Sequence, residues 1–295
     1  MPDHKDFLAA LPAADKAALT VPSDAAGLIH LAGHAGMILV TGALIAARVP
    51  FWPLLLPVQG VLLIFLFTLE HECTHRTPFR SPALSDWVGR VAGLLIVLPF
   101  DWFRAFHLAH HRHTNLPGKD PELDSPKPET KAGWLIHVSG LPVWRGNLGL
   151  LVRLARGRER AAYLPARALP RMEREARILL ALYAGAALSL FWSPVLLRVW
   201  VVPLLLGQPA LRIYLLAEHG DCPRVANMFE NTRTTFTTRA VRFLAWNMPY
   251  HVEHHVFPTV PFHRLPDLHR LIRDELKITA EGYAAFTRDY LARRR

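Results

Sequence analysis

Long apolar runs alternate with polar and charged segments along this chain. Residues 25–47 contain no Lys, Arg, Asp or Glu over 23 positions, and residues 51–69 contain none over 19. Residues 178–197 form a third such run, and residues 199–217 form a fourth that is broken only by Arg212. A helix needs about 20 mostly apolar residues to cross a bilayer. The pattern therefore predicts an all-α integral membrane protein with four transmembrane helices, paired as two hairpins.

The polar segments between these runs predict the other parts of a single domain that covers residues 1–295. Residues 5–20 suggest a short amphipathic helix at the membrane surface. The apolar part of residues 86–100 is too short to span, so we expect this segment to lie in the interface or to re-enter the membrane partway. The expected parts are a surface segment (1–24), a first helical hairpin (25–69), a middle segment (70–170), a second hairpin (171–219) and a helical cap (220–295).

The distribution of charge predicts the orientation in the membrane. Residues 76–177 carry 17 lysines and arginines against 9 aspartates and glutamates, whereas the links near Arg48 and Arg198 carry one cation each. Cytoplasmic loops of membrane proteins carry the excess of basic residues. We therefore expect the middle segment, the cap and both termini in the cytoplasm. The first 20 residues mix acidic and basic groups, so we also expect no cleavable signal before the first span. The expected location is a bacterial inner membrane.

Histidines gather in three clusters that follow one another along the chain. They are "HECTH" (71–75), "HLAHH" (107–111) and "HVEHH" (251–255). Positions i, i+3 and i+4 of a helix share one face, so each cluster can direct its imidazoles to one point. The predicted topology brings all three to the cytoplasmic face, where a further histidine ends the fourth span. The nine candidate metal ligands are His71, His75, His107, His110, His111, His219, His251, His254 and His255.

Nine imidazoles exceed the needs of one metal ion. Zinc sites in proteins use three or four protein ligands, so two metals with open positions fit the count better. Imidazole binds iron, copper and zinc alike, and the ligand type leaves the element open. Neutral imidazole binds a metal without losing a proton near neutral pH.

The clusters and their surroundings resemble those of a known family. "HECTH", "HLAHH" and "HVEHH" are similar to the three histidine boxes of the membrane fatty acid desaturase superfamily, as are the flanking "FRAFHLAHHRHTNLPGKDPEL" and "NMPYHVEHHVFPTVPFHRLP". The resemblance spans about residues 55–275. The first-box spacing is similar to that of the acyl-lipid, sphingolipid and carotenoid branches rather than the acyl-CoA branch, and the chain as a whole most resembles the bacterial acyl-lipid branch. It implies two iron ions bound by the box histidines, with His219 as a further ligand, and O2 as cosubstrate.

The resemblance also implies an activity and its partners. The expected function is O2-dependent desaturation of a membrane fatty acyl chain, with a separate, ferredoxin-like electron donor. No dinucleotide-binding fingerprint occurs among the 17 glycines, so we expect the chain itself to bind no NAD(P)H or flavin. A hydroxylase or ketolase with the same centre is the alternative, and a non-redox metal-binding protein or zinc hydrolase is another. The basic middle segment suits anionic lipid as well as an acidic protein, and we expect no nucleic-acid partner.

Carboxylates adjoin several of the candidate ligands. Such groups commonly accept the second N–H of a metal-bound imidazole and fix its orientation. We expect this role for Glu72, Glu218 and Glu253, and for Asp120 if its loop folds back; the alternative for that loop is a solvated, charged segment. Asn247, four positions before His251, is expected to hold a water molecule or a neighbouring imidazole.

The remaining polar residues predict supporting roles. His113 points away from the face that His107 shares, and the His30/His34 pair in the first span is expected to make a helix contact rather than line a substrate channel. Arg104 and Arg233 could contact a polar headgroup. The other histidines, His4, His137, His263 and His269, are expected at the surface or at an interface, and no disulfide is expected between Cys73 and Cys222.

Overall fold

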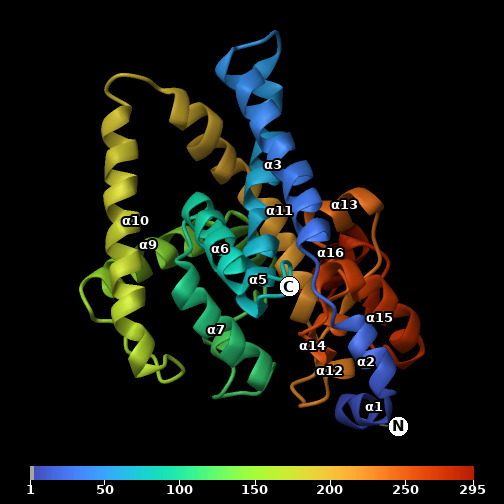
Figure 1. Ribbon diagram of the computed structural model, residues 1–295. Helices are drawn as coiled ribbons and strands as arrows, with labels where there is room; N and C mark the ends of the chain where they lie inside the picture. The colour runs from blue at the N-terminus through green and yellow to red at the C-terminus, as the bar shows by residue number, and fades with distance from the viewer. Residues whose placement is uncertain (1–2) are drawn as a thin grey trace.

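The computed structural model describes residues 3–295, and these form an all-α protein with one pair of two-residue strands (Figure 1). The longer helices are α3 (Asp24–Ala46), α4 (Leu55–Ile64), α5 (Leu66–His75), α6 (Pro82–Ile96), α7 (Phe100–His113), α9 (Leu141–Ala155), α10 (Leu169–Ser189), α11 (Val202–His219) and α16 (Tyr283–Ala292). The shorter helices are α1 (His4–Ala10), α2 (Ala13–Leu19), α8 (Lys131–Val138), α12 (Met228–Asn231), α13 (Arg239–Leu244), α14 (His251–Val256) and α15 (Leu265–Ile272). Strand β1 (Thr234–Thr235) pairs in parallel with β2 (Thr279–Ala280), and a π-helical turn, Leu197–Val201, leads into α11.

Three helical stretches of the described chain are long and apolar enough to cross a membrane. They are Ala13–Ala46, Trp52–His75 and Leu197–His219. The pair α6 and α7 passes the same test together but is bent by 102° between the two helices, as a broken span or a re-entrant segment would be. The prediction of an all-α integral membrane protein is confirmed, with three spans or four if the bent pair is counted.

The third predicted span, residues 178–197, differs from the observed helix. Helix α10 ends at Ser189, and it is not among the stretches that meet the length and hydropathy criterion. Its first half carries Arg171, Arg174 and Arg177. The apolar part from there to Ser189 is only about 12 residues, or about 18 Å of helix, which is short of the roughly 30 Å hydrocarbon core.

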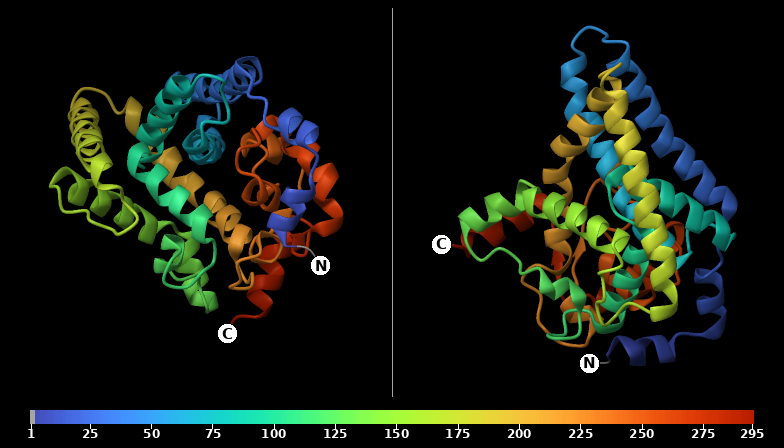
Figure 2. Two further views of the ribbon diagram at one scale, coloured as in Figure 1. Left: turned by 60° about the horizontal axis from the view of Figure 1, so that its bottom comes forward. Right: turned by 90° about the vertical axis from the view of Figure 1, so that its left-hand side faces the viewer.

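The central helices lie between two flanks (Figures 1 and 2). Helices α9 and α10 pack together on one side, and the cap, residues 220–295, lies on the other. The turn that joins α3 to the next helix and the turn that follows α10 both lie at the end of the molecule remote from α14. Residues 4–19 form two short helices where one amphipathic helix was predicted, and residues 1–2 of the expected surface segment lie outside the described range.

Two glycines allow helices α4 and α11 to pack closely against each other. A Cβ atom on Gly60 would lie 2.1 Å from the Pro203 carbonyl oxygen, and one on Gly207 would lie 2.1 Å from the Gly60 carbonyl oxygen. Small residues let the backbones of membrane helices approach and gain van der Waals contact. Since α4 continues into α5 and α11 ends at His219, this contact sets the spacing of the helices that carry histidines.

We expect Gly60→Ala to destabilise the protein by about 1–3 kcal/mol, the usual range for overpacking a close contact. The measurement is the thermal unfolding midpoint of the detergent-solubilised protein. Gly185→Ala on α10 is the matched control, because a Cβ there meets no atom within 4 Å. That control should unfold at the wild-type temperature or slightly above it, since alanine favours a helix over glycine by about 0.5–1 kcal/mol. Equal midpoints for both variants would contradict this account of the helix contact.

Candidate metal centre

The first histidine cluster lies at the end of α5. His71 and His75 are four positions apart, which places their rings on one face with centroids 5.8 Å apart. The helix ends at Arg76, which has a left-handed conformation (φ 59°). The Arg76 guanidinium donates two hydrogen bonds, of 2.8 and 2.7 Å, to Asp86 of α6. This pair fixes the helix end next to the two imidazoles.

The second cluster lies in the last two turns of α7. The ring centroids of His107 and His111 are 4.4 Å apart, and His110 lies beside them on the same helix. Arg104 Nε donates a 2.8 Å hydrogen bond to the Thr74 carbonyl and joins α7 to the end of α5. Arg104 therefore makes a helix-to-helix contact, where a headgroup contact was considered.

The third cluster forms α14, a six-residue helix in which every residue is buried. Trp246 and Asn247, which precede it, both have positive φ (49° and 57°), so the chain turns sharply before the helix begins. The Thr234 hydroxyl of β1 accepts a hydrogen bond from the Val252 amide at 3.3 Å. Strand β1 thereby positions the helix that carries the last three histidines.

Five of the nine predicted ligands form a first group. One nitrogen from each of the five lies within 4.8 Å of one nitrogen from every other. Helix α5 contributes two imidazoles, α7 contributes two and the cap contributes one. The members are His71, His75, His107, His111 and His254.

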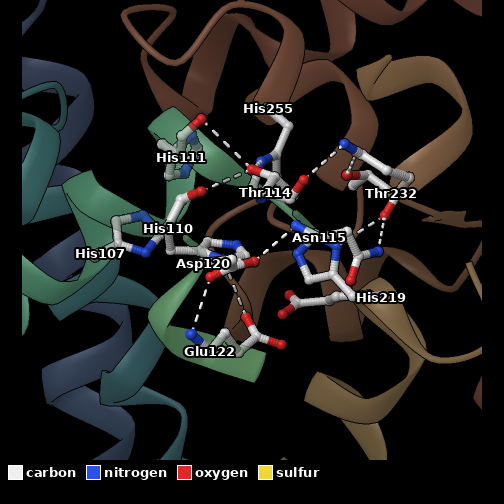
Figure 3. Close-up of polar contacts among 12 residues, drawn as sticks. His107, His110, His111, Thr114, Asn115, Asp120, Glu122, His219, Thr232 and His255 are labelled. Carbon is white, nitrogen blue, oxygen red and sulfur yellow. Dashed lines mark hydrogen bonds and ion pairs between the residues drawn. The ribbon is translucent and has the colours of Figure 1, made fainter. Parts of the chain in front are cut away.

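The other four predicted ligands form a second group next to the first. Figure 3 shows three of them, His110, His219 and His255. His110, His219 and His255 satisfy the same 4.8 Å criterion. His251 adjoins them, since its Nε2 lies 3.2 Å from His219 Nε2 and 3.1 Å from His255 Nε2. Helices α7, α11 and α14 contribute to this group, so each of α7 and α14 serves both.

The donor set fits bound cations. Both ring nitrogens of His71 are buried without a hydrogen-bond partner in the described chain, and so are the Nδ1 atoms of His111, His251 and His254. Burial of a polar atom without a partner costs free energy, and such atoms in a folded protein call for an ion or a ligand. Nitrogen ligands of this kind suit iron, copper or zinc.

The protonation state of the third cluster also favours metal binding. Burial, followed by repulsion from the neighbouring imidazoles, lowers the pKa of His251, His254 and His255 well below the ordinary histidine value. These three side chains are therefore neutral near neutral pH. A neutral imidazole has a free lone pair for a metal.

Asp120 supports the second group through His110 (Figure 3). The loop after α7 folds back, the first of the two alternatives left open by the sequence, and both carboxylate oxygens of Asp120 accept from His110 Nδ1, at 2.9 and 3.0 Å. The same carboxylate accepts from the backbone amides of Asn115 (2.7 Å) and Glu122 (2.9 Å). The Glu122 carboxylate lies 3.5 Å from the same imidazole nitrogen. The other ring nitrogen of His110, Nε2, is therefore left to face the other imidazoles of the second group.

Two of the three other predicted carboxylates face a candidate ligand. Glu218 lies 3.4 Å from His251 Nδ1, and Glu72 lies 3.7 Å from His254 Nδ1. The second oxygen of Glu72 accepts from the Thr77 hydroxyl (2.9 Å) and the Phe262 amide (3.1 Å). Glu72 thus joins α5 to the cap beside the first group.

Two predicted supporting residues have other partners. Glu253 accepts from the His269 ring and from the Thr234 hydroxyl, both at 2.5 Å, because it projects from the face of α14 opposite to the metal groups. Asn247 donates to the Phe262 carbonyl at 3.0 Å and stabilises the turn before α14. The predicted contact of Glu253 with a ligand imidazole is therefore wrong, and Asn247 contacts the Phe262 carbonyl where a neighbouring imidazole was one of the two predicted partners. No sequence signal marked His269, predicted at the surface or an interface, as the partner of Glu253.

The remaining histidines and cysteines have structural roles or lie apart from the groups. His34 accepts from Trp246 Nε1 (3.2 Å) and its Nε2 bonds to the Leu62 carbonyl (2.9 Å), which confirms the predicted helix contact. His30 bonds to the Phe243 carbonyl at 2.7 Å. His4 is buried where its Nδ1 accepts from the Met228 amide at 3.3 Å, at an interface with the cap, and both cysteines are free. His113 belongs to neither group in the described chain.

Comparison with known proteins gives one consistent result. The sequence profile described as "Fatty acid desaturase" matches residues 47–287. The chain is 25% identical over 246 residues to an sn-1 oleoyl-lipid 12-desaturase of Arthrospira platensis, covering 72% of this chain and 66% of the relative. It is 27% identical over 212 residues to a sphingolipid delta(4)-desaturase/C4-monooxygenase of Rattus norvegicus, covering 70% of this chain and 60% of the relative.

A third relative matches over a shorter region. It is an sn-1 acyl-lipid omega-3 desaturase (ferredoxin) of Synechocystis, 33% identical over 64 residues, which cover 22% of this chain and 18% of the relative. The chain therefore spans less than two thirds of the length of each of these three relatives.

Proposed function

Because the chain belongs to the fatty acid desaturase family, we propose that it is an O2-dependent desaturase of membrane fatty acyl chains, most simply those of acyl lipids. The observation that carries the proposal is the convergence of nine imidazoles in two adjoining groups. Two groups of five and four nitrogens suit two metal ions better than one. The proposed ions are iron, and the site faces the cytoplasm of a bacterial inner membrane.

The histidines of the first group would hold one iron ion and those of the second group the other. Bound iron supplies the activation of O2 that cleavage of an unactivated C–H bond requires. The overall reaction takes one hydrogen from each of two neighbouring CH2 groups. Together with O2, two electrons and two protons, it yields a C=C double bond and two molecules of water.

The apolar surroundings of the first group suit an acyl chain. Phe67 and Phe103 pack together with ring centroids 5.3 Å apart, and Phe103 lies 5.6 Å from the His107 ring. Phe67 lies one helical turn before His71 on α5, farther into the apolar stretch Trp52–His75. In our proposal these rings contact the acyl chain and exclude water, so that one pair of C–H bonds is held toward the metals.

A hydroxylase is the second candidate. The rat relative is named as both a desaturase and a C4-monooxygenase, and it is similar to this chain over most of its length. The same centre would then insert one oxygen atom and release one molecule of water. Both activities need electrons from outside, and we propose a separate carrier protein as their source.

Product analysis tests the proposal. The chain is expressed with a ferredoxin and its reductase in a host with saturated lipids, and the extracted acyl chains are analysed by mass spectrometry. We expect a product that is two hydrogens lighter than its precursor and is absent without O2. A product heavier by one oxygen would favour the second candidate. Unchanged lipids in cells that hold the iron-loaded protein would contradict both.

A further inference from the structure

A basic cavity of about 840 Å³ lies beside the second histidine group. Five cationic and two acidic side chains line it, so that its wall carries a net positive charge. The cationic residues are Lys127, Arg224, Arg233, Arg293 and Arg294, and the acidic ones are Glu129 and Asp221. The proposed desaturation chemistry assigns no role to this cavity.

The wall of the cavity is held together from three parts of the chain. Asp221, after α11, pairs with Arg293 at 2.9 Å and also with Arg294, both after α16. The Tyr290 hydroxyl donates a 2.6 Å hydrogen bond to the Pro128 carbonyl of the loop that follows α7. These contacts make the cavity a preformed feature of the cytoplasmic segments. Arg224 is exposed and pairs with no acidic group in the described chain, and the Arg293 side chain is 53% exposed.

His219 connects the cavity with the second group. It forms part of the cavity wall together with Asn115 (Figure 3). Its Nε2 lies 3.2 Å from His251 Nε2, and its Nδ1 bonds to the Asn231 carbonyl at 3.1 Å. One imidazole therefore separates the cavity from the remaining members of the second group, whereas the first group lies beyond it.

We propose that this cavity is the docking site of an acidic one-electron carrier protein, and that electrons enter the second group at His219. The inference rests on the proposed function, which needs two electrons for each product. Each reduced carrier would give one electron to a ferric ion in the second group and leave oxidised, so two encounters supply one turnover. Complementary charge speeds such encounters, and interfaces of redox partners are small and transient.

Charge reversal on the cavity rim tests the docking site. The test variant is Arg224→Glu combined with Arg293→Glu, in the full-length, iron-loaded protein. The matched control is Arg156→Glu combined with Arg158→Glu, which makes the same charge change on exposed arginines after α9, away from the cavity. The probe is an acidic [2Fe–2S] ferredoxin, and the measurement is its dissociation constant at low and at high salt.

We expect the test variant to bind ferredoxin at least tenfold more weakly than the wild type at low salt, with the difference shrinking as salt rises. The control should change less than twofold. Iron content and the product of a single turnover after chemical reduction should match the wild type in both. Wild-type affinity in the test variant, or an equal loss in the control, would overturn the docking site.

A lipid headgroup is the other anion that such a cavity could hold. Loss of binding to phosphatidylglycerol vesicles by the test variant, with ferredoxin binding retained, would overturn the proposal in favour of a headgroup site. Failure of the proposed function has a different signature. In that case the chemically reduced wild type forms no product, while the predicted difference in ferredoxin affinity still supports the docking site.

Discussion

His254→Ala is expected to reduce product formation by more than about 100-fold and to remove at least one iron per chain. His254 is the only member of the first group that the cap provides, and its Nε2 lies 3.1 Å from His111 Nε2. Loss of a residue that merely supports a metal ligand costs about 10–100-fold in affinity or activity, so loss of a ligand should cost more. Iron per chain is measured by elemental analysis, and product by mass spectrometry.

His113→Ala is the matched control for this prediction. His113 ends α7 two positions after His111 but belongs to neither group in the described chain. We expect near wild-type iron content and activity from this variant. Thermal unfolding of both variants separates a loss of folding from a loss of metal. A folded His254→Ala protein with two irons and full activity would show that His254 is no ligand.

Asp120→Asn is expected to weaken iron binding at the second group by about 10–100-fold, with a similar loss of activity. The carboxylate holds the His110 ring by accepting from its Nδ1 with both oxygens, and it also accepts from two backbone amides. Asparagine has nearly the same shape, but its NH2 group would face at least one of these donors. The imidazole would then lose its fixed orientation and part of its basicity. Competition with an iron chelator measures the affinity.

Asp124→Asn makes the same chemical change in the same loop at an exposed side chain. We expect wild-type iron affinity from it, since no contact joins Asp124 to an imidazole in the described chain. If Asp120→Asn and Asp124→Asn held iron equally well, the carboxylate would have no part in positioning His110. If Asp120→Asn lowered the stability of the protein without changing its iron affinity, Asp120 would stabilise the loop only.

The membership of the candidate centre could be predicted from local spacing and topology. The i, i+3, i+4 pattern of each cluster requires only a helix, and the helix forms in each case. The apolar runs predict the membrane spans, and the order of these spans places all three histidine clusters on the same side of the membrane. His219 was predicted by its position after the last span, and it lies in the second group.

The division of the nine histidines between the two groups could not be predicted. His110 and His111 are neighbours in sequence, yet they belong to different groups, because successive residues of a helix are rotated by about 100°. Which neighbour faces which group depends on how α7 and α14 are rotated against each other. For the same reason Glu253 faces His269 although it adjoins His254 in sequence.

The membrane segments show where composition alone was insufficient. A run of uncharged residues predicted a third span at 178–197, but its helix starts earlier, with three arginines, and ends earlier, at Ser189. Residues 86–100, which include most of α6, were predicted to be too short to span and to lie in the interface or re-enter partway; the bent pair α6 and α7 fits a re-entrant segment or a broken span. The 102° bend lies at residues 97–99, where Val97 ends α6 with φ 62°, a rare conformation for a β-branched residue, and Pro99 precedes α7.

The iron content of the purified, reconstituted protein tests the central claim most directly. Elemental analysis against a protein concentration from amino-acid analysis gives the number of metal ions per chain. The two groups of five and four histidines predict two iron ions per chain. A single zinc ion per chain, or one iron at saturation, would contradict the account.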